Sequence, residues 1–250
     1  MSKLVLIGGG ENGREGTLYE TEKIDEEIVK GTKKKQPNFL FLAHGNKYEK
    51  SYYEIMQKIY ADRFGCKCDI LKKEEVFNKE ISEEKIKWAD IVYVGGGNTL
   101  NMINLWKKSG LADILKRYID TQKTFCGISA GAICWCKYGL SDSRKFTNNS
   151  DKFIRVAGLG LIDILLCPSY DEKEAKQENL KNMMQRTHKI PAIAFEKGTA
   201  IVIEDEKYKA IKSLNNKKIY KCFYRDKEYQ KIEIKVDDKF YKLENLVRKS

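Results

Sequence analysis

Short apolar segments alternate with longer amphipathic ones along the 250-residue chain, and this alternation restricts its fold more than any other feature. Five segments rich in β-branched, aromatic and aliphatic residues predict buried strands: residues 4–7, 39–43, 68–71, 91–94 and 124–128. Others place apolar side chains three and four apart, as on one helix face: residues 51–64, 100–106 and 111–119. The order strand, helix, strand predicts a three-layer α/β fold, whose mostly parallel sheet carries helices on both faces.

The last fifty or so residues follow a different pattern. Four segments alternate apolar and polar residues and are separated by charged turns: residues 200–204, 208–213, 218–225 and 229–235. Such alternation is typical of antiparallel strands. Because no linker rich in Gly, Ser or Pro precedes them, we expect a single domain over residues 1–250, with a C-terminal β extension over about residues 200–250.

Composition excludes several classes of protein. With 42% apolar and 33% charged residues, the chain can bury a large core and is not disordered. Its apolar runs end after a few residues, so we expect no membrane span, and the N-terminus lacks the features of a secretory signal, which predicts a cytoplasmic protein. The seven cysteines form no C-x-x-C pair, so we expect reduced thiols in the core and no metal. The formal charge of +11 is spread over lysines interleaved with glutamates, which argues against nucleic acid as a partner.

Three glycine-rich turns follow predicted strands, at the carboxyl edge where open α/β sheets bind ligands. The first, at residues 8–13, formally matches the G-x-G-x-x-G pattern of dinucleotide sites. However, the second strand ends in His44-Gly45 and not in the acidic residue that would hold a ribose. We therefore expect a tight turn here and no cofactor, and keep nucleotide binding as a third alternative.

The other two turns indicate chemistry. Residues 95–98 precede a predicted helix and present backbone N–H groups suited to a carboxylate, a phosphate or an oxyanion. Gly127-Ile128-Ser129-Ala130-Gly131 follows a strand directly and leads into helix-compatible residues 132–138, which is the setting of a nucleophile elbow. In such a turn the Ser129 hydroxyl stands above the sheet, and the Ala130 N–H can join an oxyanion hole. The alternative is a close contact of strand and helix with an incidental serine.

Together these motifs resemble the peptidase E (aspartyl dipeptidase) family of serine peptidases, which are relatives of cyanophycinase on a fold like that of class I glutamine amidotransferases. The similarity spans the chain and is carried by five segments: residues 4–10, 94–99, 127–132, 167–171 and 192–200. The resemblance implies attack by Ser129 on a peptide carbonyl, with Gly97 and Ala130 as oxyanion donors. It also implies that Asn98 helps to hold the substrate and that Asp142 orients the base, although Asp142 equally fits a helix cap or turn.

The sequence departs from the family at the base. Where the family reads Cys-Pro-His-Tyr, this chain has Cys167-Pro168-Ser169-Tyr170. Loss of the base from a serine triad lowers turnover by a factor on the order of 10⁶. Only His44 and His188 could replace it, and His44 is the better candidate because it lies on the same predicted rim as Ser129. A Ser-Lys pair is a further alternative.

The resemblance also implies a small peptide as substrate, one that begins with aspartate. A basic residue on the helix after the base motif would bind the aspartate, and Lys176 fits this position better than Lys173, although a solvated surface lysine is an equally simple interpretation. The leading hypothesis is a serine exopeptidase that forms an acyl-enzyme on Ser129. The competing one is a catalytically impaired relative that binds a peptide or small anion without turnover. A homodimer is compatible with the sequence, which does not set the oligomeric state.

Overall fold

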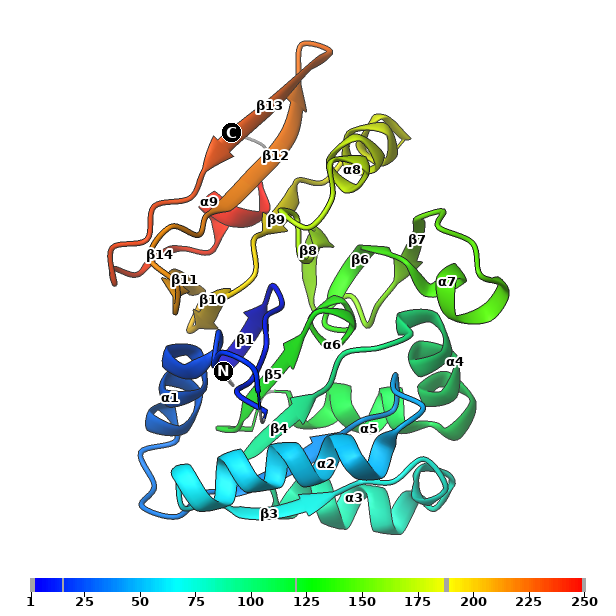
Figure 1. The fold of residues 1–250 in the computed structure, drawn as a ribbon, viewed down its shortest axis with the longest axis vertical. Helices are drawn as coiled ribbons and strands as arrows, with labels where there is room; N and C mark the ends of the chain where they lie inside the picture. The colour runs from blue at the N-terminus through cyan, green and yellow to red at the C-terminus, as the bar shows by residue number, and fades with distance from the viewer. Residues whose placement is uncertain (1–2, 15, 120, 187–188, 249–250) are drawn as a thin grey trace.

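Two β-sheets with helices packed around them form the molecule (Figure 1). The structure, a computed structural model, describes residues 3–14, 16–119, 121–186 and 189–248. The first sheet has eight strands in the order β14-β11-β10-β1-β5-β4-β2-β3, and the second has six in the order β13-β12-β9-β8-β6-β7. The predicted α/β class is confirmed, whereas a second sheet was not part of the expectation.

Parallel strands form the centre of the first sheet, as predicted. They are β1 (Lys3–Ile7), β2 (Asn38–Leu42), β3 (Lys67–Ile70), β4 (Ile91–Val94) and β5 (Thr124–Ile128). All residues of β1, β4 and β5 are buried, because helices cover both faces of the sheet. The predicted strands begin and end within one residue of the observed ones.

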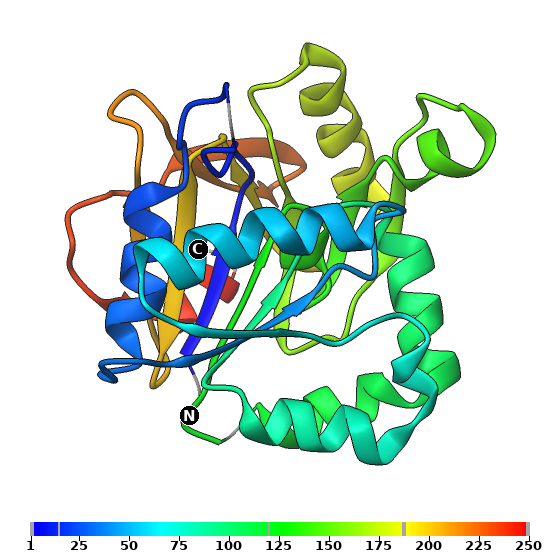
Figure 2. The same cartoon turned by 60° about the horizontal axis from the view of Figure 1, so that its bottom comes forward.

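The helices of the first sheet divide between its two faces. On one face, α1 (Glu22–Gly31) and α2 (Glu49–Gln57) pack on Val5, Ile7 and their neighbours, and both helices lie in front of the strands in Figure 2. The other face carries α3 (Lys79–Trp88), α4 (Thr99–Ser109) and α5 (Leu111–Tyr118). The predicted helix over residues 51–64 is present, although its second half, Lys58–Arg63, is a π-helix.

The second sheet starts where the sequence favoured a helix. Residues 132–138 were expected to be helical, but α6 (Ala130–Ile133) is a single turn and β6 (Cys136–Ser141) follows it. The expectation was wrong because β6 pairs on both sides, with β7 (Ile154–Ala157) and β8 (Ile162–Cys167). These long-range pairings override local propensity. The neighbouring strand β9 (Ala192–Phe195) is parallel to β8.

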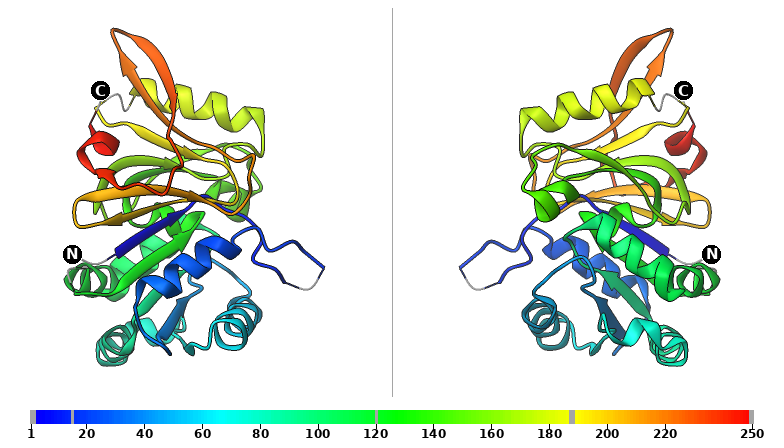
Figure 3. Two further views of the ribbon diagram at one scale, coloured as in Figure 1. Left: turned by 90° about the vertical axis from the view of Figure 1, so that its left-hand side faces the viewer. Right: turned by 90° about the vertical axis from the view of Figure 1, so that its right-hand side faces the viewer.

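The four expected C-terminal strands are present, but they are shared between the two sheets. β10 (Thr199–Glu204) extends the first sheet antiparallel to β1, and β11 (Lys207–Lys212) follows antiparallel to β10, with β14 (Tyr241–Lys242) at the edge. β12 (Ile219–Arg225) and β13 (Glu228–Glu233) extend the second sheet beside β9. Figure 3 shows one sheet above the other, and the β12–β13 hairpin projecting from the upper one.

Three further α-helices, α7 (Ser143–Asn148), α8 (Glu174–Arg186) and α9 (Glu244–Val247), and a 3₁₀-helix at Glu75–Phe77 complete the described elements. α8 lies over the second sheet, where Leu180 and Met184 pack against Leu165 and Cys167. Among the described residues, none of the helices combines the length and apolar character needed to cross a bilayer.

Two buried tryptophans allow a matched test of this core. Trp106 and Trp135 are both 0% exposed, and their ring centroids lie 6.3 Å apart. Trp106 Nε1 donates a 2.8 Å hydrogen bond to His44 Nδ1, whereas Trp135 Nε1 has no hydrogen-bond partner among the described residues. We expect Trp106→Phe to lower the free energy of unfolding by about 1–2 kcal/mol more than Trp135→Phe, because only the former leaves a buried acceptor unpaired. Urea unfolding of both variants measures this; equal losses would contradict it.

Candidate active site

Ser129 lies on a strained turn between β5 and α6. Its backbone has φ 54° and ψ −111°, a conformation that a residue with a side chain rarely adopts. The Ser129 N–H donates to Ile7 O at 3.0 Å, and the residue is only partly buried. Among the described residues, its Oγ atom has no hydrogen-bond partner. The hydroxyl is thus available for chemistry.

The two glycines around Ser129 are required by close backbone contacts. A Cβ atom on Gly127 would overlap Gly131 O, and one on Gly131 would overlap Val94 O. α6 therefore begins directly against the ends of β4 and β5. This is the packing expected of a nucleophile elbow, and it accounts for the G-x-S-x-G spacing on steric grounds.

Ser169 lies on the other side of β1. Its N–H donates to Gly8 O at 2.9 Å, its Oγ lies 3.4 Å from the same oxygen, and its φ is 48°. Consecutive carbonyls of an extended chain point in opposite directions, so the neighbouring Ile7 and Gly8 hold one serine each. The Oγ of Ser169 lies 2.7 Å from the place that a Cβ on Gly9 would occupy, so this glycine keeps the space between the serines open.

The first glycine-rich segment, residues 8–13, lies beside both serines, because Gly9 and Gly10 line the same cavity. A Cβ on Gly8 would overlap the Phe195 side chain, and a Cβ on Gly10 would lie 3.2 Å from Thr21 Cγ2 and 3.3 Å from Gly198 N. These contacts account for Gly8 and Gly10 on steric grounds. The expected tight turn is not what the structure shows: residues 8–11 have no regular secondary structure, and Asn12 forms an antiparallel bridge with Tyr19.

A cavity of about 230 Å³ contains both serines. Its other lining residues come from the N-terminal loop, α2 and the loops after β4, β5 and β9: Gly9, Gly10, Glu11, Glu20, Tyr52, Gly96, Ile128 and Lys197. A second cavity of about 330 Å³ shares five of these residues and continues toward Arg14, Asn46 and Tyr48. The serines therefore lie in a cleft that can hold a small peptide.

The expected oxyanion donors are backbone amides near Ser129. Ala130 is the first residue of α6, and neither its N–H nor that of Gly97 has a hydrogen-bond partner among the described residues. The neighbouring Gly96 lies beside Ser129, since a Cβ there would be 3.8 Å from Ser129 Cβ. The Gly96 N–H donates to Tyr52 Oη at 3.3 Å. The roles of Gly97 and Ala130 stay predictions.

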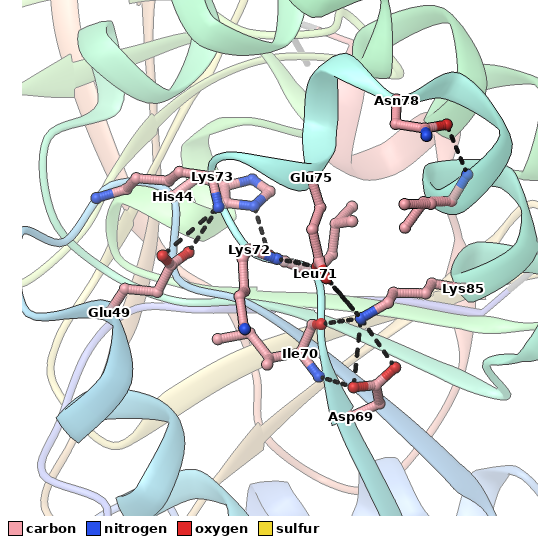
Figure 4. Close-up of polar contacts among 11 residues, drawn as sticks. His44, Glu49, Asp69, Ile70, Leu71, Lys72, Lys73, Glu75, Asn78 and Lys85 are labelled. Carbon is pink, nitrogen blue, oxygen red and sulfur yellow. Dashed lines mark hydrogen bonds and ion pairs between the residues drawn. The ribbon is translucent and has the colours of Figure 1, made fainter.

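His44 is not placed to serve Ser129, which corrects the idea that it could replace the missing base. The ring is buried, and its Nε2 lies 2.7 Å from Leu71 O (Figure 4). Its Nδ1 accepts a hydrogen bond from Trp106 Nε1. Burial lowers the pKa of His44 to about 4, with a smaller opposing effect of the Leu71 hydrogen bond. Since both ring nitrogens are engaged on the far side of β2 from the cleft residues, His44 is structural. His188 lies outside the described residues.

Asn98 and Asp142 hold the scaffold and do not line the serine cavity. The Asn98 side chain caps α4 by accepting from Asn101 N at 3.0 Å, and its Nδ2 donates to Ser143 O at 3.3 Å. Asp142 precedes α7, where its carbonyl accepts from Lys145 N at 2.8 Å. Asn98 thus joins α4 to the start of α7, and Asp142 supports the first turn of α7, so this geometry gives no support to substrate contact by Asn98 or to a triad role for Asp142.

Lys176 is also used within the protein. It is 7% exposed, its Nζ donates to Pro168 O at 3.0 Å, and Glu172 Oε2 lies 3.4 Å away. Its ammonium also lies 5.6 Å from the centre of the Phe153 ring. The solvated-lysine alternative is thus wrong, and the side chain instead supports the turn that carries Ser169.

Three charged groups of the serine cavity were missed by the sequence reasoning: Glu11, Glu20 and Lys197. Lys197 follows β9, and Glu20 lies in the N-terminal loop, held between Tyr19 and Thr21, whose hydroxyls both donate to the buried Asp25. A search of residues beyond every strand end would have found Lys197. No pattern indicates Glu20, because the loop fold brings it to the cavity. Among the described residues, no group of three or more His, Cys, Asp or Glu could hold a metal ion.

Comparison with known proteins gives a consistent result. The sequence model of peptidase family S51 matches residues 4–211. The uncharacterized peptidase YgaJ of Bacillus subtilis is 27% identical over 246 residues, covering 94% of this chain and 98% of that protein. Peptidase E of a Nostoc species is 27% identical over 231 residues, covering 88% and 89%. A crystal structure of a peptidase from an acI-B1 actinobacterium superposes with a TM-score of 0.71 at 17% identity, covering 96% of each chain, which shows a shared fold.

A structural role for His44 can be tested by His44→Phe. The change leaves Trp106 Nε1 and Leu71 O without their partner, so we expect a loss of about 2–5 kcal/mol in unfolding free energy. Turnover per folded molecule should stay unchanged. A selective loss of turnover with intact stability would restore His44 as a catalytic base.

The low pKa of His44 gives a second test. Since the folded state disfavours its charged form, the stabilising effect of neutral His44 is present above about pH 6.5 and is lost as pH falls toward about 4. Between about pH 6.5 and pH 4, we expect the unfolding free energy to decrease less steeply in His44→Phe than in the unmodified protein. Urea unfolding at several pH values measures this. An unchanged slope would contradict the buried, neutral ring.

Proposed function

The chain belongs to peptidase family S51, and from this membership together with the geometry of its cleft we propose that it is a serine-type exopeptidase, similar to dipeptidase E, that hydrolyses small aspartyl-leading peptides. The observation that carries the proposal is Ser129 itself, strained at φ 54° on an elbow whose hydroxyl opens into the cavity. Strain of this kind persists where the surrounding structure enforces it for function.

The proposed reaction uses the serine as nucleophile. Ser129 Oγ attacks the peptide carbonyl, and the Gly97 and Ala130 N–H groups stabilise the oxyanion. Collapse of the intermediate breaks the C–N bond, the leaving amine takes up a proton, and an acyl-enzyme remains on Ser129. Water then hydrolyses this ester and releases the acidic residue.

The proton of Ser129 needs an acceptor in this scheme. Ser169 stands where the family places histidine, and a serine hydroxyl cannot serve as a base at neutral pH. Because Gly9 leaves the space beside Ser169 Oγ open, we infer that water bound to this hydroxyl accepts the proton. Water is a weak base, so the expected turnover is slow and rises with pH.

Restoring the base tests the proposal. With an aspartyl p-nitroanilide as substrate, we expect Ser129→Ala to abolish turnover and Ser169→His to raise it by about 10²–10⁴-fold, the usual contribution of a positioned general base. Histidine tolerates the positive φ of position 169. Ser169→Asn is the matched control, since asparagine has similar tolerance but cannot accept the proton. Turnover unaffected by Ser129→Ala would overturn the proposal.

Added imidazole offers an independent test. A free base of the right size can occupy the open space at Ser169, so imidazole should increase turnover of the unmodified chain in a saturable way. The same addition should have little effect on Ser169→His and none on Ser129→Ala. An increase in turnover that is linear in imidazole concentration and equal for all three proteins would reflect catalysis in solution. That result would contradict binding of imidazole in the space beside Ser169.

A further inference from the structure

The serine cavity contains one positive charge. Of the described residues that line it, Lys197 is the only basic one, while Glu11 and Glu20 are acidic. An anionic group entering beside Ser129 therefore has a single cationic partner. The two glutamates repel an anion, so Lys197 is the side chain of this cavity that can hold one.

The backbone around Lys197 is held rigidly at this position. Its N–H donates to Asp171 Oδ1 at 3.1 Å, and the next residue, Gly198, donates to Gly9 O at 2.9 Å. Asp171 also forms an ion pair with Lys217. Burial alone would raise the pKa of Asp171, but the hydrogen bonds from Lys217 and Lys197 hold it below its usual value. The loop between β9 and β10 is thus fixed against both the Ser169 turn and β1.

The side chain of Lys197 has room to receive a ligand. Its Nζ lies 3.7 Å from Glu172 Oε1, which is beyond hydrogen-bond distance, and the side chain is 38% exposed. Its Cγ lies 3.7 Å from the place that a Cβ on Gly9 would occupy, on the same side as Ser169 Oγ. A substrate carboxylate could therefore replace this loose pairing with Glu172.

These surroundings favour a binding role over a catalytic one. A lysine that serves as a general base needs burial away from carboxylates, which stabilises the neutral amine. Lys197 is partly exposed and faces Glu172, so it lacks the burial that a catalytic lysine needs. The Ser-Lys alternative therefore finds no support at this residue.

We propose that Lys197 is the residue that recognises the acidic side chain of the substrate, in place of the internally bonded Lys176. This inference rests on the proposed function, since it assigns the acyl-side residue of the peptide to the Ser129 cavity. It differs from the expectation drawn from the family resemblance, in which a basic residue on α8 has this role.

Binding measured on the Ser129→Ala background tests the inference without turnover. Calorimetric titration would compare aspartyl-leucine, asparaginyl-leucine and aspartyl-leucinamide. We expect Lys197→Met to weaken binding of aspartyl-leucine about 10-fold or more, the usual effect of losing a charge-assisted hydrogen bond, and to change asparaginyl-leucine less than about threefold. Lys197→Arg should retain the preference, and Glu172→Gln should increase affinity for the aspartyl peptide by removing the competing carboxylate.

Three outcomes would overturn this assignment. The first is an aspartyl-to-asparaginyl preference that survives Lys197→Met, or no measurable binding of aspartyl-leucine at all. The second is a preference lost equally in Lys173→Met, the control for general charge, or lost only in Lys176→Met. The third is that Lys197→Met affects only recognition of the C-terminal carboxylate. In that case the variant would bind aspartyl-leucine and aspartyl-leucinamide equally. The proposed function fails separately, if turnover survives Ser129→Ala.

Discussion

Hydrogen bonding at the carboxyl end of β1 determines the rest of the site. Ile7 O accepts from the N–H of Ser129 and Gly8 O from the N–H of Ser169, so two segments forty residues apart in sequence meet at adjacent peptide groups. β1 can do this because it lies between β5 and β10 inside the first sheet, while Phe195 at the end of β9 packs against Gly8. The junction of the two sheets and the cavity of Ser129 and Ser169 are therefore one structural feature.

Strain is concentrated at this junction. Ser129 and Ser169 both have positive φ, and glycines stand wherever a side chain would overlap the facing backbone. Left-handed backbone at residues with a side chain costs about 1–3 kcal/mol each, so the surrounding contacts must enforce it. The persistence of this geometry with serine at position 169 indicates that the turn is determined by backbone contacts with Gly8 and Phe195 and not by an imidazole.

Charge placement separates Lys176, which is used inside the protein, from Lys197, which we propose binds substrate. Lys176 and Lys197 both approach Glu172, but Lys176 is consumed by the Pro168 carbonyl below the turn, whereas Lys197 reaches the cavity. The position of Lys176 in the sequence could not reveal this difference. It lies on the inner face of α8, where its side chain reaches the Pro168 carbonyl. His44 is a similar case: its position after β2 placed it near the rim, but its ring points away to Leu71 and Trp106.

The sequence by itself determined the order along the chain of the central strands and helices, the strands of the C-terminal segment and the elbow at Ser129. These depend on local signals: side-chain periodicity, and glycines that a tight strand-to-helix turn requires. Only the tertiary structure decided that residues 136–141 form a strand, that the C-terminal strands divide between two sheets, and that Lys197 and Glu20 share the cavity of Ser129. Such features depend on pairing between distant segments, whose free energy comes from long-range hydrogen bonds and packing that no local pattern records.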